Sequence, residues 1–182
     1  ITAFASRTRH KVNYSDIGGD LAGMRTEKVQ AWLGLLEKSD IIFYLHPYSN
    51  NQLKRTVSKP KLISMIAVLS RTLPVGQALK GAILENYTVA EIVKSYYYSG
   101  EMPLINYYRD NDAKEIDVVI ESDGETHPME IKKTSNPGTQ LVRPFRLLDK
   151  GSVKRGQGAI LSRMDTLTAI DSQNLIVPIW SI

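Results

Sequence analysis

The chain has 182 residues, of which 42% are hydrophobic and 23% charged, and its net charge is +4. This length and balance fit one ordinary domain or two small ones and exclude a disordered or fibrous protein. The apolar runs are too short to cross a bilayer, no secretory leader is visible, and the absence of cysteine excludes disulfides and thiolate metal sites. We therefore expect a cytoplasmic protein without a membrane partner.

Residues 1–73 are predicted to begin with three helices. A short helix is expected over residues 2–10, and a second from Ser15, the predicted N-cap, to about Gly23. The third begins near Thr26 and repeats apolar residues at helical spacing. Its apolar stripe consists of Val29, Trp32, Leu33 and Leu36.

A hairpin is predicted after these helices. Residues 41–45 are rich in strand formers, and residues 61–63 form the returning strand beyond a basic connection. Three helices and a hairpin are the order of a winged helix, which places its last helix in the DNA major groove. That helix carries both signs of charge, which favours the wing as the DNA-binding element. The nucleic-acid-binding candidates are Lys54, Arg55, Lys59 and Lys61, with Lys133 later in the chain. The alternative is a spacer or a protein-docking module.

Residues 74–182 are predicted to form a second domain of the α/β type. The joint lies at Pro74–Gly76, and a long helix follows from about residue 78 to 97, before Gly100. The expected strands cover residues 105–109, 115–121, 126–132, 158–162 and 175–180, with a helix over residues 139–148. This order indicates a mixed sheet flanked by helices, and hence an α+β chain overall.

Three charged residues are brought together by a hairpin of the second domain. An Asp-Gly turn at residues 123–124 makes the flanking strands antiparallel neighbours. Asp117 lies about six residues before that turn and Glu130 about six after it, so strand pairing places them roughly opposite each other. Lys132 shares the face of Glu130 because side chains alternate along a strand. Burying these charges is costly unless they bind a cation or one another.

This arrangement suits metal-dependent cleavage of a phosphodiester. Asp117 and Glu130 offer hard oxygen ligands for Mg²⁺ or Mn²⁺, and the backbone carbonyl of Ile131 adds a third. The metal would lower the pKa of a bound water, while Lys132 would orient that water or stabilise negative charge on phosphorus. Glu85, on the preceding helix, would hold a metal-bound water. The alternative is a structural ion-pair cluster.

The charge distribution fits the same chemistry. Residues 41–84 contain no acidic residue, and residues 85–130 hold 11 of the 19 acids. From residue 131 to 164 the only acid is Asp149, against eight lysines and arginines. An acidic centre between basic flanks suits an enzyme that holds both a cation and a polyanion. Ordinary solvated faces are the alternative.

Several segments resemble, in order, a known family. They are Gly-Ala-Ile-Leu-Glu-Asn-Tyr at residues 81–87, Tyr-Tyr-Arg-Asp at 107–110, Glu-Ile-Asp at 115–117 and Met-Glu-Ile-Lys-Lys at 129–133. Together with residues 29–37 and 47–51, they resemble the DUF4143-type region, a domain of unknown function found behind the ATPase domain of prokaryotic AAA+ proteins. The aspartate and Glu-x-Lys across a hairpin also resemble the PD-(D/E)XK nuclease superfamily.

The resemblance implies a restriction-endonuclease-like domain, joined by a winged helix to an ATPase domain that is missing upstream. It implies an Mg-dependent DNA endonuclease, and any ATP hydrolysis would need the missing domain. The start without methionine fits either a piece of a larger protein or a trimmed chain. The alternative function is a catalytically inactive accessory module that binds DNA or protein for the ATPase.

Overall fold

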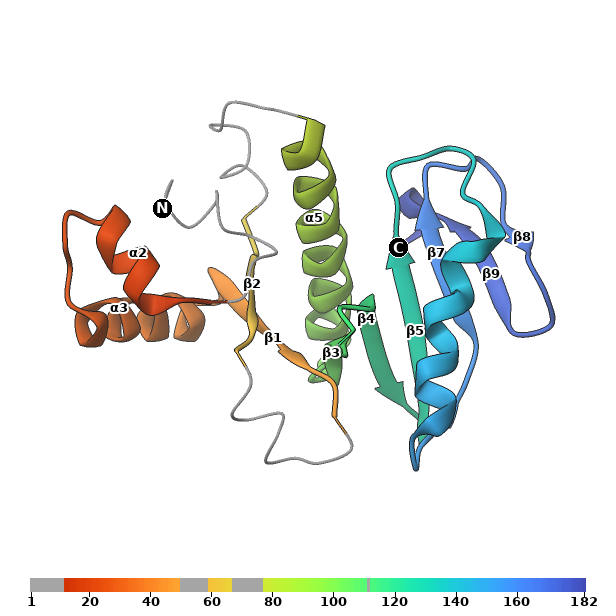
Figure 1. Ribbon diagram of the computed structural model, residues 1–182, viewed down its shortest axis with the longest axis horizontal. Helices are drawn as coiled ribbons and strands as arrows, with labels where there is room; N and C mark the ends of the chain where they lie inside the picture. Colours follow the sequence, from red (N-terminus) through yellow and green to blue (C-terminus); the bar gives the residue numbers. More distant parts are fainter. Residues whose placement is uncertain (1–11, 50–58, 67–76, 111) are drawn as a thin grey trace. The chain divides into compact units, whose positions relative to one another are not determined.

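The computed structural model of the chain describes residues 12–49, 59–66, 77–110 and 112–182 (Figure 1). It is a mixed α/β protein with both parallel and antiparallel strand pairs. The chain divides into two compact units, which are described in turn. Unit 1 lies within residues 1–45 and 59–90, and unit 2 within residues 46–58 and 91–182.

Unit 1 begins with two short helices that pack against each other. Helix α2 spans Tyr14–Asp20, and helix α3 spans Thr26–Lys38. The N-cap of α2 is Asn13, whose side-chain oxygen accepts a hydrogen bond from the N–H of Ser15 at 3.2 Å. The prediction of Ser15 as the cap is therefore wrong. Asparagine takes this position because its short side chain reaches an N–H that the first helical turn leaves unpaired.

A hydrophobic core joins these helices to two strands. Strand β1 spans Ile42–Pro47 and strand β2 spans Lys61–Ser64, and the two pair antiparallel. The buried residues of this core are Val12, Ile17, Val29, Leu33, Ile42 and Leu62. The predicted stripe of α3 is confirmed at Val29 and Leu33, but Trp32 is half exposed and lies outside the core.

Helix α5 spans Gln77–Tyr98, and Gly100 follows its end with a φ of +77°, which favours glycine. Its residues up to Ala90 belong to unit 1. The polar residues Glu85 and Asn86 are buried, whereas the aromatic Tyr87 is 45% exposed. The spacing of apolar residues alone does not identify the buried face of α5. Glu85 and Asn86 are buried although they are polar, because both have partners on β2.

Unit 2 contains a mixed sheet built around a hairpin. Its strands are β3 (Ile105–Arg109), β4 (Glu115–Ser122), β5 (Glu125–Ile131), β6 (Lys154–Arg155), β7 (Gly158–Ser162), β8 (Thr168–Ala169) and β9 (Asn174–Pro178). Hydrogen bonds join them in the order β3-β4-β5-β7-β9-β8, and β6 adds to β5. The pairs β5–β7 and β7–β9 are parallel, whereas β3–β4, β4–β5 and β8–β9 are antiparallel. The two-residue strands β6 and β8 are not predicted by the sequence.

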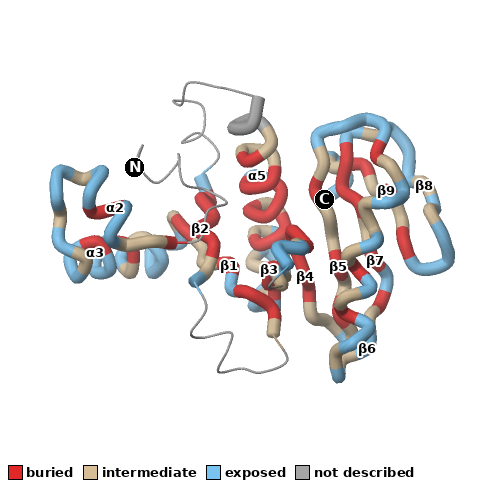
Figure 2. Tube along the Cα trace, in the orientation of Figure 1, coloured by how far each residue is buried: buried red, intermediate tan, exposed pale blue. Residues whose placement is uncertain are grey.

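The turn between β4 and β5 is tight. Asp123 and Gly124 have φ angles of +52° and +75°, the backbone of a type I′ hairpin that suits an Asp-Gly pair. The ladder pairs Ser122 with Glu125 and extends into the largely buried β4 (Figure 2). The predicted Asp-Gly reversal is confirmed, and it fixes which residues of the two strands face each other.

A 3₁₀ helix, η2, spans Thr139–Lys150 and packs against β4, β5 and β7. The sequence predicted a helix there, and its apolar residues are spaced three apart. This spacing suits a 3₁₀ helix, in which side chains three residues apart align along the axis. Val142, Phe145 and Leu148 form such a row and pack into a buried cluster with residues of unit 2. The other members of that cluster are Tyr48, Tyr108, Ile116 and Val119. A short 3₁₀ turn, η3 (Ile179–Ser181), follows β9.

Two predictions of domain organisation fall outside the described residues. These are the helix over residues 2–10 and the joint at Pro74–Gly76. The boundary between residues 73 and 74 therefore stays a prediction. None of the helices in the described ranges is long and apolar enough to pass through a lipid bilayer.

Candidate functional site

Strands β4 and β5 separate at one end, and the side chain of Asp117 fills the opening. The ladder between the strands ends with Val118 opposite Met129. Beyond it, the backbone N–H of Ile131 donates to Asp117 Oδ2 at 2.9 Å. Asp117 is only 4% exposed, so this charge-assisted hydrogen bond orients a carboxylate that is almost entirely removed from solvent.

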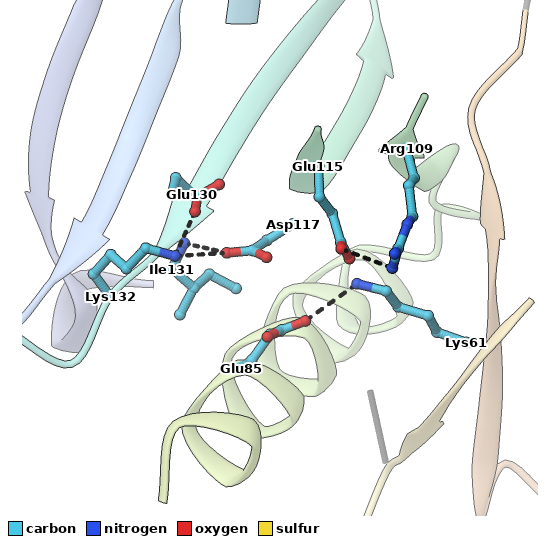
Figure 3. A network of polar contacts seen from close by, with 8 residues as sticks. All are labelled: Lys61, Glu85, Arg109, Glu115, Asp117, Glu130, Ile131 and Lys132. Carbon is cyan, nitrogen blue, oxygen red and sulfur yellow. Dashed lines mark hydrogen bonds and ion pairs between the residues drawn. The ribbon is translucent and has the colours of Figure 1, made fainter. Parts of the chain in front are cut away.

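Glu130 and Lys132 complete a cluster with Asp117 (Figure 3). The ammonium of Lys132 pairs with Glu130 Oε1 and lies 3.7 Å from Asp117 Oδ2. The side chains of Asp117, Glu130 and Lys132 are 5%, 12% and 34% exposed. The structure thus brings together the three residues that the sequence placed across the hairpin.

The neighbouring strand β7 holds the backbone of this cluster from the other side. The N–H of Lys132 donates to the carbonyl of Leu161 at 2.9 Å. A residue in a strand directs its N–H and its C=O toward the same neighbouring strand. The backbone groups of Lys132 therefore point toward β7, and those of Ile131 point toward β4. The carbonyl of Ile131 therefore points toward the opening that holds Asp117.

The cluster contains two carboxylates and one ammonium group. Carboxylate oxygens in a site screened from water are suitable ligands for a hard cation. No group of three or more acidic, histidine or cysteine side chains suited to a metal occurs among the described residues. A cation at this cluster would therefore rest on Asp117, Glu130, a backbone carbonyl and water. This set fits Mg²⁺, which keeps several waters and commonly uses one or two carboxylates.

The carboxylate of Glu85 forms an ion pair within unit 1. Its Oε1 lies 3.3 Å from Lys61 Nζ, and the two side chains are 8% and 3% exposed (Figure 3). The next residue, Asn86, binds the backbone of Ser64 in both directions. It accepts the N–H of Ser64 at 2.8 Å and donates to its carbonyl at 2.9 Å. The side-chain amide therefore acts toward β2 as the backbone of a further strand would.

Lys61 was expected on a basic surface together with other residues of the wing. The structure corrects this expectation, because Lys61 is buried and its ammonium pairs with Glu85. Lys59 and Lys133 are exposed. Lys54 and Arg55 lie outside the described residues. Sequence reasoning missed the pairing of β2 with α5, and the one available signal was the adjacent Glu-Asn of the segment at residues 81–87.

An ion pair stabilises the strand ends that lead to Asp117. Arg109 Nη1 lies 3.4 Å from Glu115 Oε2, and these two residues face each other at the start of the β3–β4 ladder. Burial, and then the charge of Asp110, raise the pKa of the neighbouring Tyr108, which keeps its phenol protonated. The ion pair lies two residues before Asp117 on β4.

Two family models match the chain. One, described as "Domain of unknown function (DUF4143)", matches residues 80–182, and the other, described as "Domain of unknown function (DUF8612)", matches residues 1–65. No curated protein and no solved structure matches. The first match contains the cluster of Asp117, Glu130 and Lys132 and also Glu85, whereas Lys61 falls in the second.

Proposed function

Because residues 80–182 match it, the chain belongs to the family described as "Domain of unknown function (DUF4143)", and we propose that this domain is a metal-dependent nuclease module. One observation carries the proposal. The hydrogen bond from Ile131 holds the Asp117 carboxylate in the opening of the hairpin, beside Glu130 and Lys132. Two largely buried carboxylates with one lysine form a donor set for a hard divalent cation and leave a positive group for the substrate.

Each residue has a distinct role in this proposal. Asp117 and Glu130 would hold Mg²⁺ or Mn²⁺, with the carbonyl of Ile131 as a further ligand. When bound, the metal would lower the pKa of a water and polarise the phosphate. Lys132 is 34% exposed, so its ammonium reaches both the carboxylates and an arriving phosphodiester. It orients the attacking water or offsets the charge that develops on phosphorus.

The order of elements supports a restriction-endonuclease-like fold for this domain. Helix α5 is followed by the β3–β4–β5 meander, then by η2 and by β7, which pairs parallel to β5. A winged helix in the N-terminal segment, an AAA+ ATPase domain upstream and DNA as the substrate belong to the same proposal. They rest on the resemblance of the ordered sequence segments. A role for Glu85 beside the metal stays a prediction.

A second candidate is a catalytically inactive accessory module that binds DNA or protein for an ATPase. The observation in its favour is that Lys132 already supplies a counter-charge to Glu130 and approaches Asp117. In that case the cluster is a structural ion-pair group, and divalent metal changes neither activity nor stability.

The test is cleavage of plasmid DNA with Mg²⁺ or Mn²⁺, using the full chain beside Lys132→Ala and Asp117→Asn. We expect nicking by the parent protein and a loss of about 100-fold or more in each variant. Circular dichroism confirms that the variants are folded. Equal nicking by the parent protein and Lys132→Ala would mean that the activity comes from elsewhere, and the nuclease proposal would be rejected.

A further inference from the structure

The cations of unit 2 divide into paired and unpaired groups. Lys154 pairs with Glu125, and Arg155 Nε lies 2.6 Å from Asp149 Oδ1. Within the part of the chain that the structure describes, another set of exposed cations has no acidic partner within ion-pair distance. This set is Lys133, Arg143, Arg146, Lys150 and Arg163. Asp149, the only acid between residues 131 and 164, is already engaged by Arg155.

Helix η2 presents its two arginines in a row. Its N–H groups bond three residues back, as Leu141 does to Gly138 at 3.2 Å. Residues three apart therefore lie one above the other, and Arg143 and Arg146 are separated by about 6 Å along the helix axis. The apolar row of η2 packs inward, so the arginine row is left to solvent.

Helix η2 lies over the face of the sheet that carries Glu130. Val119 packs against the apolar row of η2, and its strand partner Pro128 lies on the same face of β5 as Glu130, two residues further along. The packing of Phe145 on Gly158 places η2 over the same face. A Cβ built on Gly158 would lie 2.7 Å from Phe145 Cδ2, so this face of β7 is directed at η2. Gly158 lies on the same face of β7 as Ile160, the strand partner of Glu130.

Two further unpaired cations stand at the edge of the sheet where the cluster lies. Strands β5 and β7 are parallel, so their ends meet at the same edge. Lys133 directly follows Lys132 there. The backbone N–H of Arg163, just after β7, donates to the carbonyl of Thr134 at 3.0 Å, which holds the two chain segments together.

We propose that Arg143, Arg146, Lys133 and Arg163 form a track for the sugar-phosphate backbone of a nucleic acid, which guides it to the cluster of Asp117, Glu130 and Lys132. Guanidinium groups suit phosphate because they donate two parallel hydrogen bonds. Unpaired cations in a row also release counterions from a polyanion when it binds. The inference rests on the proposed function for the chemistry after binding, but not for binding itself. It moves the binding surface from the predicted wing to unit 2.

The test is fluorescence anisotropy of a labelled oligonucleotide, with no divalent metal, over a series of salt concentrations. The double variant Arg143→Ala/Arg146→Ala should bind about tenfold more weakly at about 50 mM salt. Its slope of log affinity against log salt should be shallower by about 1.8 on duplex DNA, since each lost phosphate contact removes about 0.9. The matched control Arg143→Lys/Arg146→Lys keeps both charges and should retain most of the slope.

Two results would overturn the track. One is an unchanged salt slope in the alanine double variant. The other is competition by poly-glutamate as strong as that by unlabelled oligonucleotide, which would indicate a general cation patch. The absence of divalent metal separates this inference from the nuclease proposal, because binding is then measured without a bound cation and without cleavage. If binding follows the arginines but no cleavage occurs with Mn²⁺, the track stands and the nuclease proposal fails.

Discussion

Asp117 accepts, at 2.9 Å, the backbone hydrogen bond of Ile131, a residue 14 positions later in the chain. The register of the β4–β5 hairpin would otherwise set Ile131 opposite Ile116. A side-chain carboxylate thus takes the place of a backbone carbonyl. The exchange opens the strand pair at one end and keeps a charged group almost entirely buried. Substitutions at this position separate the structural role of the carboxylate from its charge.

Asp117→Asn should keep the fold and lose divalent binding, because the amide oxygen still accepts from Ile131 but carries no charge. Asp117→Ala should also cost about 1–3 kcal/mol of unfolding free energy, since it leaves a buried N–H unsatisfied. Calorimetric titration with Mn²⁺ and urea unfolding measure the two effects. Identical stability of the two variants would contradict the assigned role of the hydrogen bond.

Lys132→Met removes the counter-charge of Glu130 and Asp117. Without metal we expect a loss of about 1–2 kcal/mol, less than for a fully buried pair because the lysine is 34% exposed. Adding Mn²⁺ should restore stability, since a cation then replaces the ammonium. Thermal unfolding with and without Mn²⁺ is the measurement. A purely structural ion pair predicts no rescue by the metal.

Lys61→Met should destabilise unit 1 by about 3–5 kcal/mol, because Glu85 then keeps a buried charge without its ammonium partner. The double variant Lys61→Met/Glu85→Leu should recover most of that loss, since apolar side chains of similar size fill the same space. Urea unfolding of the parent protein, of the two single variants Lys61→Met and Glu85→Leu, and of the double variant completes a mutant cycle. Additive losses in the double variant would show that the two groups do not act as a pair.

Gly18→Ala should destabilise α2, because the added methyl group would overlap the carbonyl oxygen of Met24. The expected loss is about 1–3 kcal/mol. The matched control is Gly19→Ala, where nothing lies within 4 Å of the added carbon. That substitution should stabilise the helix by about 0.5–1 kcal/mol. Thermal unfolding that ranks the two variants in the opposite order would refute this account of the close approach.

The pH dependence of Glu125 follows from its contact with Lys154. A hydrogen bond from Lys154, and then its charge, lower the pKa of Glu125 below its ordinary value. The contribution of the Glu125–Lys154 contact to folding stability is therefore present above the unfolded-state pKa of Glu125, about 4.3. It is lost as the pH falls through the folded-state pKa of Glu125. Lys154→Ala should raise the pKa of Glu125 toward its ordinary value, as followed by carboxyl NMR. Lys150→Ala removes an exposed charge that does not act on Glu125, and should leave the pKa of Glu125 nearly unchanged.

Local sequence chemistry determined the hairpin and the opposition of its charges. The Asp-Gly turn accepts only a few backbone conformations, so counting outward from it places Asp117 opposite Glu130. The period-two alternation of β5 then puts Lys132 on the same face. The long helix α5 and the strands β3, β4 and β7 were also predicted from the sequence. Each has a clear pattern of apolar residues that is bounded by turn-forming or helix-stopping residues.

Only the tertiary structure decided which charged groups are engaged. The sequence places Lys61 among surface cations and Glu85 near a metal, but their mutual ion pair joins positions 24 residues apart. It likewise gives no sign that Arg155 is neutralised by Asp149 while Arg143 and Arg146 stay unpaired. Periodicity reports the local environment of a side chain. Burial of polar groups depends instead on partners that folding brings from distant segments, and no local pattern encodes them.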